Sequence, residues 1–289
     1  MSFRNYLRPL KVRLRSLQAI GIKRIRPRVL RTLPHDSEAF TQGLCLHRGS
    51  LYESTGLAGR SSLRVIDSDT GRVERQIALQ EALGSTSVSH LDGNEDDSEE
   101  DRVNKAFAEG IAILNDRLYQ LTWRSGIALR YSLPALEPVD TLPLTGQGWG
   151  LASDGNHLVL SNGSSLIEFR DAELGLVKSV RITANGLPFG LINDLAVHNG
   201  KLYFNVYRHP WIYVADMESG RVERVLDLAD IAREEARILP AGVEPRRDVM
   251  LNGIAIDSPK GLAYVTGKLW SHYYVISLGE ADHPTVATT

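Results

Sequence analysis

A short phrase recurs five times along this chain, and it limits the possible folds more than any other feature of the sequence. Each copy starts with a polar or aromatic residue, continues in four cases with glycine, and ends with leucine or isoleucine. The copies are Gln42-Gly43-Leu44, Glu109-Gly110-Ile111, Trp149-Gly150-Leu151, Asn193-Asp194-Leu195 and Asn252-Gly253-Ile254. Self-similarity in units of about 40 to 45 residues is typical of a repeat protein, in which each unit forms the same small structure.

Every phrase opens a short apolar strand that ends in a turn and is followed by a second strand. Turn segments such as Asn115-Asp116 and Asp154-Gly155-Asn156 favour tight hairpins, because their residues tolerate positive φ or bond locally. Third and fourth strands are visible at 62–66 and 73–78. Four short antiparallel strands in each unit predict an all-β fold, namely a five-bladed β-propeller with four-stranded antiparallel blades around a central channel. A sandwich or an eight-stranded barrel does not require the same phrase in every sheet.

The repeat also divides the chain. We expect a basic N-terminal arm over residues 1–31, a propeller over 32–278 with an acidic insertion at about 81–105 and a helical insertion at about 227–250, and a C-terminal tail over 279–289. The acidic insertion has low hydrophobicity, which predicts a solvated loop. Closing strands of propellers are sometimes taken from the other terminus, so Val29 to Leu33 is expected to complete the last blade.

The N-terminal arm contains ten Lys or Arg residues and precedes the first acidic residue, Asp36. The apolar stretch Leu17 to Ile22 is too short for a secretory signal, and no run of about 18 apolar residues predicts a membrane span. The arm is therefore a solvated or packed tail, a surface-associating helix or an organelle-type presequence, and a cytoplasmic location follows from sequence alone. The formal net charge of −2 gives no reason to expect nucleic acid as a partner. A single cysteine, Cys45, excludes an internal disulfide and favours a buried thiol.

Candidate site residues follow from the repeat, because the innermost strand of each blade lines the channel. The five phrases place Gln42, Glu109, Trp149, Asn193 and Asn252 at one mouth of the channel. A second tier at or near the ends of the second strands contains Glu53, Trp123, Tyr207 and Lys268, and two of the phrases are preceded by Phe40 and Phe107. Ordered water or packing between blades would explain any one of these residues. Together, a few polar groups with aromatic walls predict a small-ligand pocket.

Phrases spread over the predicted blades also carry a resemblance to a known family. They are His35-Asp36-Ser37-Glu38-Ala39-Phe40-Thr41-Gln42-Gly43-Leu44, Tyr52-Glu53-Ser54-Thr55-Gly56, Phe107-Ala108-Glu109-Gly110, Leu121-Thr122-Trp123, Gly148-Trp149-Gly150-Leu151, Leu251-Asn252-Gly253-Ile254-Ala255 and Val265-Thr266-Gly267-Lys268-Leu269-Trp270. From about Leu33 to Leu278 the chain resembles the plant and bacterial type of glutaminyl cyclase. The resemblance implies an aminoacyltransferase that converts the N-terminal glutamine of peptides or proteins to pyroglutamate and releases ammonia, without zinc or another cofactor.

The residues that match the family are Phe40, Gln42, Phe107, Glu109, Trp123, Trp149, Asn193 and Lys268, of which the resemblance makes Glu109 the catalytic acid/base. A carboxylate suits the reaction because the attacking amine must lose a proton and the departing nitrogen must gain one. We expect Asn193 and Lys268 to assist catalysis, and the remaining residues of both tiers to bind substrate. Tyr207 stands where the family often has tryptophan, and Ala196 where an acid often follows. Relatives are often secreted or periplasmic, whereas no export signal is visible here.

Two other functions remain open at the level of the sequence. A metal-dependent lactonase or related propeller hydrolase is one, since Glu109, Asn193 and Asn252 are oxygen ligands of the kind that bind calcium. A propeller that binds peptides without catalysis is the other. Sensitivity to chelators separates the first from a cyclase, and ammonia release separates the second. The sequence does not reveal the oligomeric state.

Overall fold

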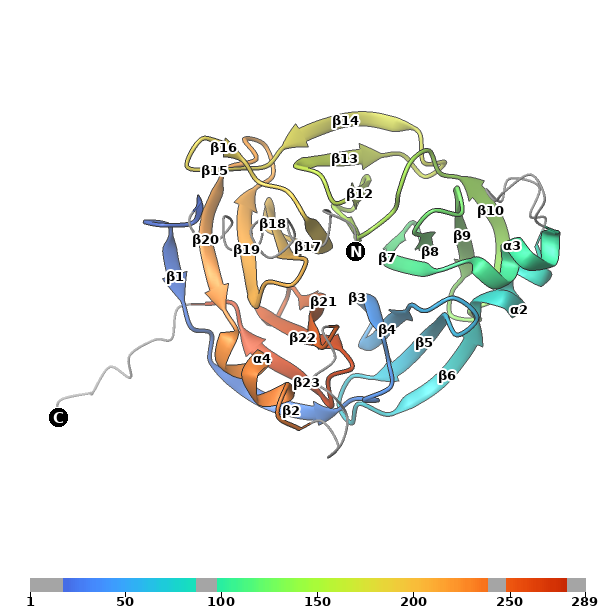
Figure 1. Ribbon diagram of the computed structural model, residues 1–289, viewed down its shortest axis with the longest axis horizontal. Helices are drawn as coiled ribbons and strands as arrows, with labels where there is room; N and C mark the ends of the chain where they lie inside the picture. The colour runs from blue at the N-terminus through green and yellow to red at the C-terminus, as the bar shows by residue number, and fades with distance from the viewer. Residues whose placement is uncertain (1–17, 87–97, 239–247, 280–289) are drawn as a thin grey trace, which may run out of the picture.

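The computed structural model describes residues 18–86, 98–238 and 248–279 and contains five sheets arranged radially around a common axis (Figure 1). Each sheet has four antiparallel strands, and one carries an additional fifth strand. The predicted five-bladed β-propeller is therefore confirmed. None of the helices in the described ranges is long and apolar enough to cross a membrane.

Blades 1 to 3 each follow the chain from the channel outward. Blade 1 comprises β3 (Thr41–His47), β4 (Ser50–Thr55), β5 (Ser62–Asp67) and β6 (Val73–Ala78). Blade 2 comprises β7 (Ala108–Leu114), β8 (Arg117–Thr122), β9 (Ile127–Ser132) and β10 (Pro138–Pro143). Blade 3 comprises β11 (Leu151–Ser153), β12 (Leu158–Ser161), β13 (Leu166–Arg170) and β14 (Leu176–Arg181). A small hairpin, β15 (Thr183–Ala184) and β16 (Leu187–Pro188), leads on to blade 4.

Blades 4 and 5 include strands from the start of the chain. Blade 4 comprises β17 (Ile192–His198), β18 (Lys201–Val206), β19 (Trp211–Asp216) and β20 (Val222–Asp227), with β1 (Lys23–Ile25) parallel to β20 at its outer edge. Blade 5 comprises β21 (Met250–Asp257), β22 (Leu262–Lys268) and β23 (His272–Ser277), and its outermost strand is β2 (Val29–Pro34). Because β2 pairs antiparallel with β23, the expected closure of the last blade by the N-terminal segment is confirmed.

The basic segment is integrated with the propeller from Lys23 onward. Arg24 places its guanidinium 4.3 Å from the centroid of the Trp211 ring, and its Nε donates to Asp227 Oδ2 at 2.9 Å. The segment thus contacts the outer strands of two neighbouring blades, so β1 and β2 together span the boundary between blades 4 and 5.

Helices occur in both insertions. The acidic insertion begins with α2 (Leu79–Gly84) and ends with α3 (Glu99–Lys105), while residues 87–97 lie outside the described part of the chain. The described ends of the insertion are helical where a loop was expected, because Leu83 of α2 is buried in a cluster between blades 1 and 2, and this burial stabilises a short helix. The expected solvation of the acidic tract falls mostly on residues 87–97 and stays a prediction. The helical insertion contains α4 (Ala229–Glu235), as its pattern predicted.

The core lies between the blades, where the faces of neighbouring sheets pack together. At the channel the inner strands approach so closely that the repeated glycines become necessary. A Cβ atom on Gly110 would lie 2.4 Å from the backbone nitrogen of Leu151, and one on Gly150 would lie 1.9 Å from the carbonyl oxygen of Asn193. The glycine in the phrase therefore lets the inner strands converge, which brings the preceding side chains to one mouth. Cys45, expected to be buried, is only half-buried.

Candidate active site at the mouth of the channel

Six side chains from all five blades form a closed ring, which we call the collar: Phe40, Phe107, Trp123, Trp149, Tyr207 and Lys268. All lie near the start of a first strand or the end of a second strand, which antiparallel pairing places on one face. The Phe40 and Phe107 ring centroids are 6.3 Å apart, and those of Phe107 and Trp123 are 6.0 Å apart.

The other half of the collar is held by polar contacts as well as rings. Gln147 joins two indoles, because its Oε1 accepts from Nε1 of both Trp123 and Trp149 at 3.1 Å. The Trp149 and Tyr207 centroids are 6.2 Å apart. The Lys268 ammonium nitrogen lies 4.6 Å from the Phe40 ring centroid and 5.9 Å from that of Tyr207, which closes the ring. Gln147 is a member of the site that sequence reasoning missed, although it stands two residues before its phrase, the same position that Phe40 and Phe107 hold before theirs.

A chain of buried amides connects blades 4, 5 and 1 at the same mouth. Asn193 Nδ2 donates to Asn252 Oδ1 at 2.8 Å, and Asn252 Nδ2 donates to Gln42 Oε1 at 3.2 Å. Asn205 Nδ2 donates to the same Asn252 oxygen at 3.0 Å. Among the described residues, Gln42 Nε2 and Asn193 Oδ1 have no hydrogen-bond partner. One donor and one acceptor thus remain available to a ligand.

Glu109 and Lys268 are two of the titratable groups predicted for the site, and they are only 6% and 4% exposed. Burial raises the pKa of Glu109 well above its usual range, although the Lys268 charge acts in the opposite direction. Burial lowers the pKa of Lys268 to about 8, although Glu109 opposes this shift. Because its pKa is raised, the Glu109 carboxylate is a stronger base than a free carboxylate, as suits general acid/base catalysis.

Asp194 is a second buried carboxyl group at the channel, and sequence reasoning did not assign it a role. Its Oδ2 accepts from the backbone nitrogen of Ile254 at 2.8 Å, and its buried Oδ1 has no partner among the described residues. Burial raises its pKa well above the usual range, and it contributes to the raised pKa of Glu109. The available signal was its position, because Asp194 occupies the place that glycine holds in the other four phrases.

Glu53 is fully buried and engaged by neighbours outside the collar. Its Oε1 accepts from Thr41 Oγ1 at 2.6 Å and lies 2.8 Å from His35 Nε2, while Oε2 accepts from Tyr273 OH at 3.2 Å. The other ring nitrogen of His35 lies 2.6 Å from the carbonyl oxygen of Trp270. Since both ring nitrogens face acceptors, His35 donates twice and is positively charged.

The pKa shifts of Glu53 and His35 agree with an ion pair between them. Burial alone would raise the pKa of Glu53, but the charge and hydrogen bond of His35 outweigh it and lower the pKa. For His35 burial acts to lower the pKa, and Glu53 outweighs it and raises the pKa. The contacts of Glu53 brace the segment that carries Phe40 and Gln42, so the structure gives this carboxylate a different position from the other predicted site residues.

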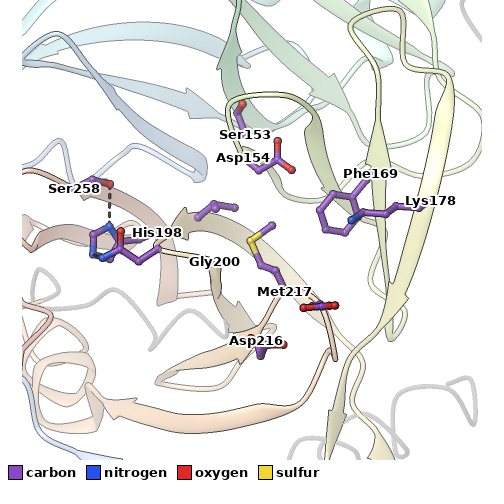
Figure 2. Close-up of a pocket in the computed structure, with 12 residues that line it drawn as sticks. Ser153, Asp154, Phe169, Lys178, His198, Gly200, Asp216, Met217 and Ser258 are labelled. Carbon is purple, nitrogen blue, oxygen red and sulfur yellow. Dashed lines mark hydrogen bonds between the residues drawn. The ribbon is translucent and has the colours of Figure 1, made fainter.

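A separate hollow lies on the opposite face, among the hairpin turns of blades 3, 4 and 5 (Figure 2). Two of its carboxylates, Asp154 and Asp216, already accept hydrogen bonds that stabilise the hairpin turns. Asp154 Oδ1 accepts from two backbone nitrogens, and Asp216 accepts from Ser219 and Lys201. His198 Nδ1 lies 3.0 Å from Ser258 Oγ. None of the predicted site residues lines this hollow.

Fold and site together define a five-bladed propeller that encloses a titratable carboxyl group beneath an aromatic collar. Residues 10–278 match the family model described as glutamine cyclotransferase. The chain is 33% identical over 258 residues to a glutaminyl-peptide cyclotransferase from Arabidopsis thaliana, covering 88% of this chain and 72% of the relative. It superposes on the crystal structure of Myxococcus xanthus glutaminyl cyclase with a TM-score of 0.73 and 29% identity, covering 89% of this chain and 97% of the other. The chain belongs to the glutamine cyclotransferase family.

Proposed function

We propose that this chain is a glutaminyl-peptide cyclotransferase that acts on peptides or proteins with a free N-terminal glutamine. In this reaction the α-amine attacks the side-chain carboxamide carbon, a new C–N bond forms, and the old C–N bond breaks to release ammonia. The observation that carries the proposal is the Glu109 carboxyl, which is buried beside the Lys268 member of the collar and has a pKa raised by burial. The names of the Arabidopsis and Myxococcus relatives support the same activity.

Positioning supplies much of the rate, because nucleophile and electrophile belong to the same residue of the substrate. When the site holds glutamine in its reactive conformer, the amine stays next to the carboxamide carbon, and the effective concentration of the nucleophile rises. The apolar rings of the collar fit the compact aliphatic part of glutamine and exclude water, which limits hydrolysis. No protein nucleophile is needed, and the chemistry requires no cofactor.

Proton transfer is the remaining task, and we assign it to Glu109. Its carboxylate takes a proton from the attacking amine and then returns one to the departing nitrogen, which leaves as ammonia. The free Gln42 Nε2 and the Lys268 ammonium are donors for the carboxamide oxygen, where negative charge develops. Asn193 has its donor bonded to Asn252, so its free Oδ1 suits it to accept from the substrate amine. Asn252 holds both neighbouring amides in position.

A lactonase-like hydrolase is the second candidate, and the hydrogen bonds weigh against it. Such an enzyme would use Glu109, Asn193 and Asn252 as oxygen ligands for a metal ion. The Asn252 oxygen already accepts two amide donors, so it offers little to a cation. Dialysis against a chelator should leave a cyclase active and inactivate a lactonase.

The direct test is mass spectrometry of a peptide that begins with glutamine. The expected result is a mass loss corresponding to ammonia, with no loss from the same peptide after N-acetylation, which removes the nucleophile. An unchanged free peptide with a folded protein would contradict the proposal and favour a propeller that only binds peptides.

A further inference from the structure

Two arginines stand just outside the collar at equivalent places in the repeat. Arg124 directly follows Trp123 at the end of the blade 2 hairpin, and Arg208 directly follows Tyr207 at the end of the blade 4 hairpin. The Arg124 guanidinium carbon lies 4.1 Å from the Trp123 ring centroid, and that of Arg208 lies 5.2 Å from the Tyr207 centroid. Each guanidinium is therefore held against an aromatic side chain of the collar.

These guanidiniums have hydrogen-bonding capacity to spare. Arg124 is exposed and makes no ion pair with any residue in the described ranges. Arg208 contacts Asp248, with Nη2 and Oδ1 3.4 Å apart, but its Nε is buried and has no partner among the described residues. Stacking on an aromatic ring fixes the orientation of a guanidinium, so less conformational freedom is lost when it binds a carboxylate.

The balance of charge at this rim is positive. The carboxylates that the described residues place beside it are already matched by arginines, as Asp36 with Arg64 at 3.0 Å, Glu38 with Arg60 at 3.5 Å and Asp248 with Arg208 at 3.4 Å. Arg124 has no carboxylate partner within the described ranges, so its charge remains in excess. An acidic side chain arriving at this rim meets a net positive field, whereas a basic side chain meets repulsion.

On the basis of the proposed function, we infer that Arg124 and Arg208 select peptides with an acidic residue directly after the N-terminal glutamine. The glutamine occupies the space beneath the collar, so the next residues of the peptide pass the two guanidiniums. The preferred substrates are therefore peptides that begin Gln-Asp or Gln-Glu, and those that begin Gln-Lys or Gln-Arg are disfavoured.

The test compares three amidated tripeptides, Gln-Glu-Ala, Gln-Ala-Ala and Gln-Lys-Ala, by kcat/KM for ammonia release at low salt. Amidation leaves the second side chain as the only difference in charge. An exposed ion pair of this kind should favour the acidic over the basic peptide by about three- to tenfold. The ratio should fall as salt is added, because exposed charges are screened.

Variants identify the residue responsible. In Arg124→Glu the ratio of acidic to basic kcat/KM should fall below one, and any general loss of turnover cancels within the ratio. The matched control is Arg117→Glu, the same charge change at the start of β8, which lies near the opposite face. It should keep the wild-type ratio. A wild-type ratio of one, or a ratio that Arg124→Glu leaves unchanged, would overturn the inference. Turnover of Gln-Ala-Ala in the same experiment would still support the proposed function. Failure to release ammonia from any of the three would overturn both.

Discussion

Replacing Glu109 by glutamine tests the proposed chemistry most directly. Glutamine keeps the size of the side chain and its capacity for hydrogen bonds but cannot carry a proton between nitrogen atoms. A general acid/base contributes about 100-fold or more to turnover, which corresponds to roughly 2.7 kcal/mol of transition-state stabilisation. We therefore expect the turnover of Glu109→Gln to fall by at least this factor.

The stability of the folded Glu109→Gln variant should be equal to or higher than that of wild type. Because burial raises the pKa of Glu109, its ionised form destabilises the folded state, by about 1.4 kcal/mol for each pKa unit. This cost is absent at acidic pH and grows as pH rises toward the folded pKa, and the neutral amide removes it. Near pH 8 the Lys268 ammonium can release its proton at little cost when its partner is lost, since its pKa is about 8.

The experiment measures two properties of purified wild type and variant near pH 8, namely the thermal midpoint and ammonia release from a Gln-initiated peptide. A structural role for Glu109 predicts a lower midpoint with smaller loss of turnover, because a buried polar group would lose its partners. Our reasoning predicts an unchanged or higher midpoint and a large loss of turnover. Turnover near wild type in a folded variant would refute the assignment.

Three further predictions follow from the same structure. The pKa of Lys268 is about 8, so if its charge stabilises the carboxamide oxygen, kcat should fall between roughly pH 7 and pH 9; a kcat that rises throughout would contradict this. Glu53→Gln leaves the buried His35 charge without its partner, so thermal or denaturant unfolding should show a loss of about 3 to 5 kcal/mol, and an unchanged midpoint would show that the pair is dispensable. Deletion of residues 87–97, within the acidic insertion, should preserve turnover per folded molecule, and inactive but folded protein would assign the insertion a catalytic role.

The fold was predictable because its determinants are local and repeated. Each phrase, hairpin turn and second strand lies within about 15 residues, and five similar copies exclude most alternatives. Closure of the last blade by residues 29–33 was predictable because propellers often pair strands from the two ends of the chain. β1 was not predicted, because Lys23–Ile25 is too short and too basic to read as a strand. Its pairing depends on the edge of β20, about 200 residues away.

The site was predictable to the extent that position in the repeat determines position at the channel. Gln42, Asn193 and Asn252 are joined by hydrogen bonds, as convergence at one mouth requires. Glu53 differs because its environment is set by partners distant in sequence, including Tyr273, which is 220 residues away. Asp194 was overlooked because the second position of the phrase was interpreted as a backbone position, since the other four copies have glycine there.

Closure of the ring by β2 also sets the order in which the protein can fold during synthesis. β2 leaves the ribosome among the first strands, whereas its partner β23 is among the last. Blades 1 to 4 can form on the growing chain, but blade 5 cannot be completed until synthesis has ended. Until then β2 has no partner, and an unpaired strand can associate with other chains. The basic residues around β2 repel their counterparts on other nascent copies and so protect the strand that is made early and paired last.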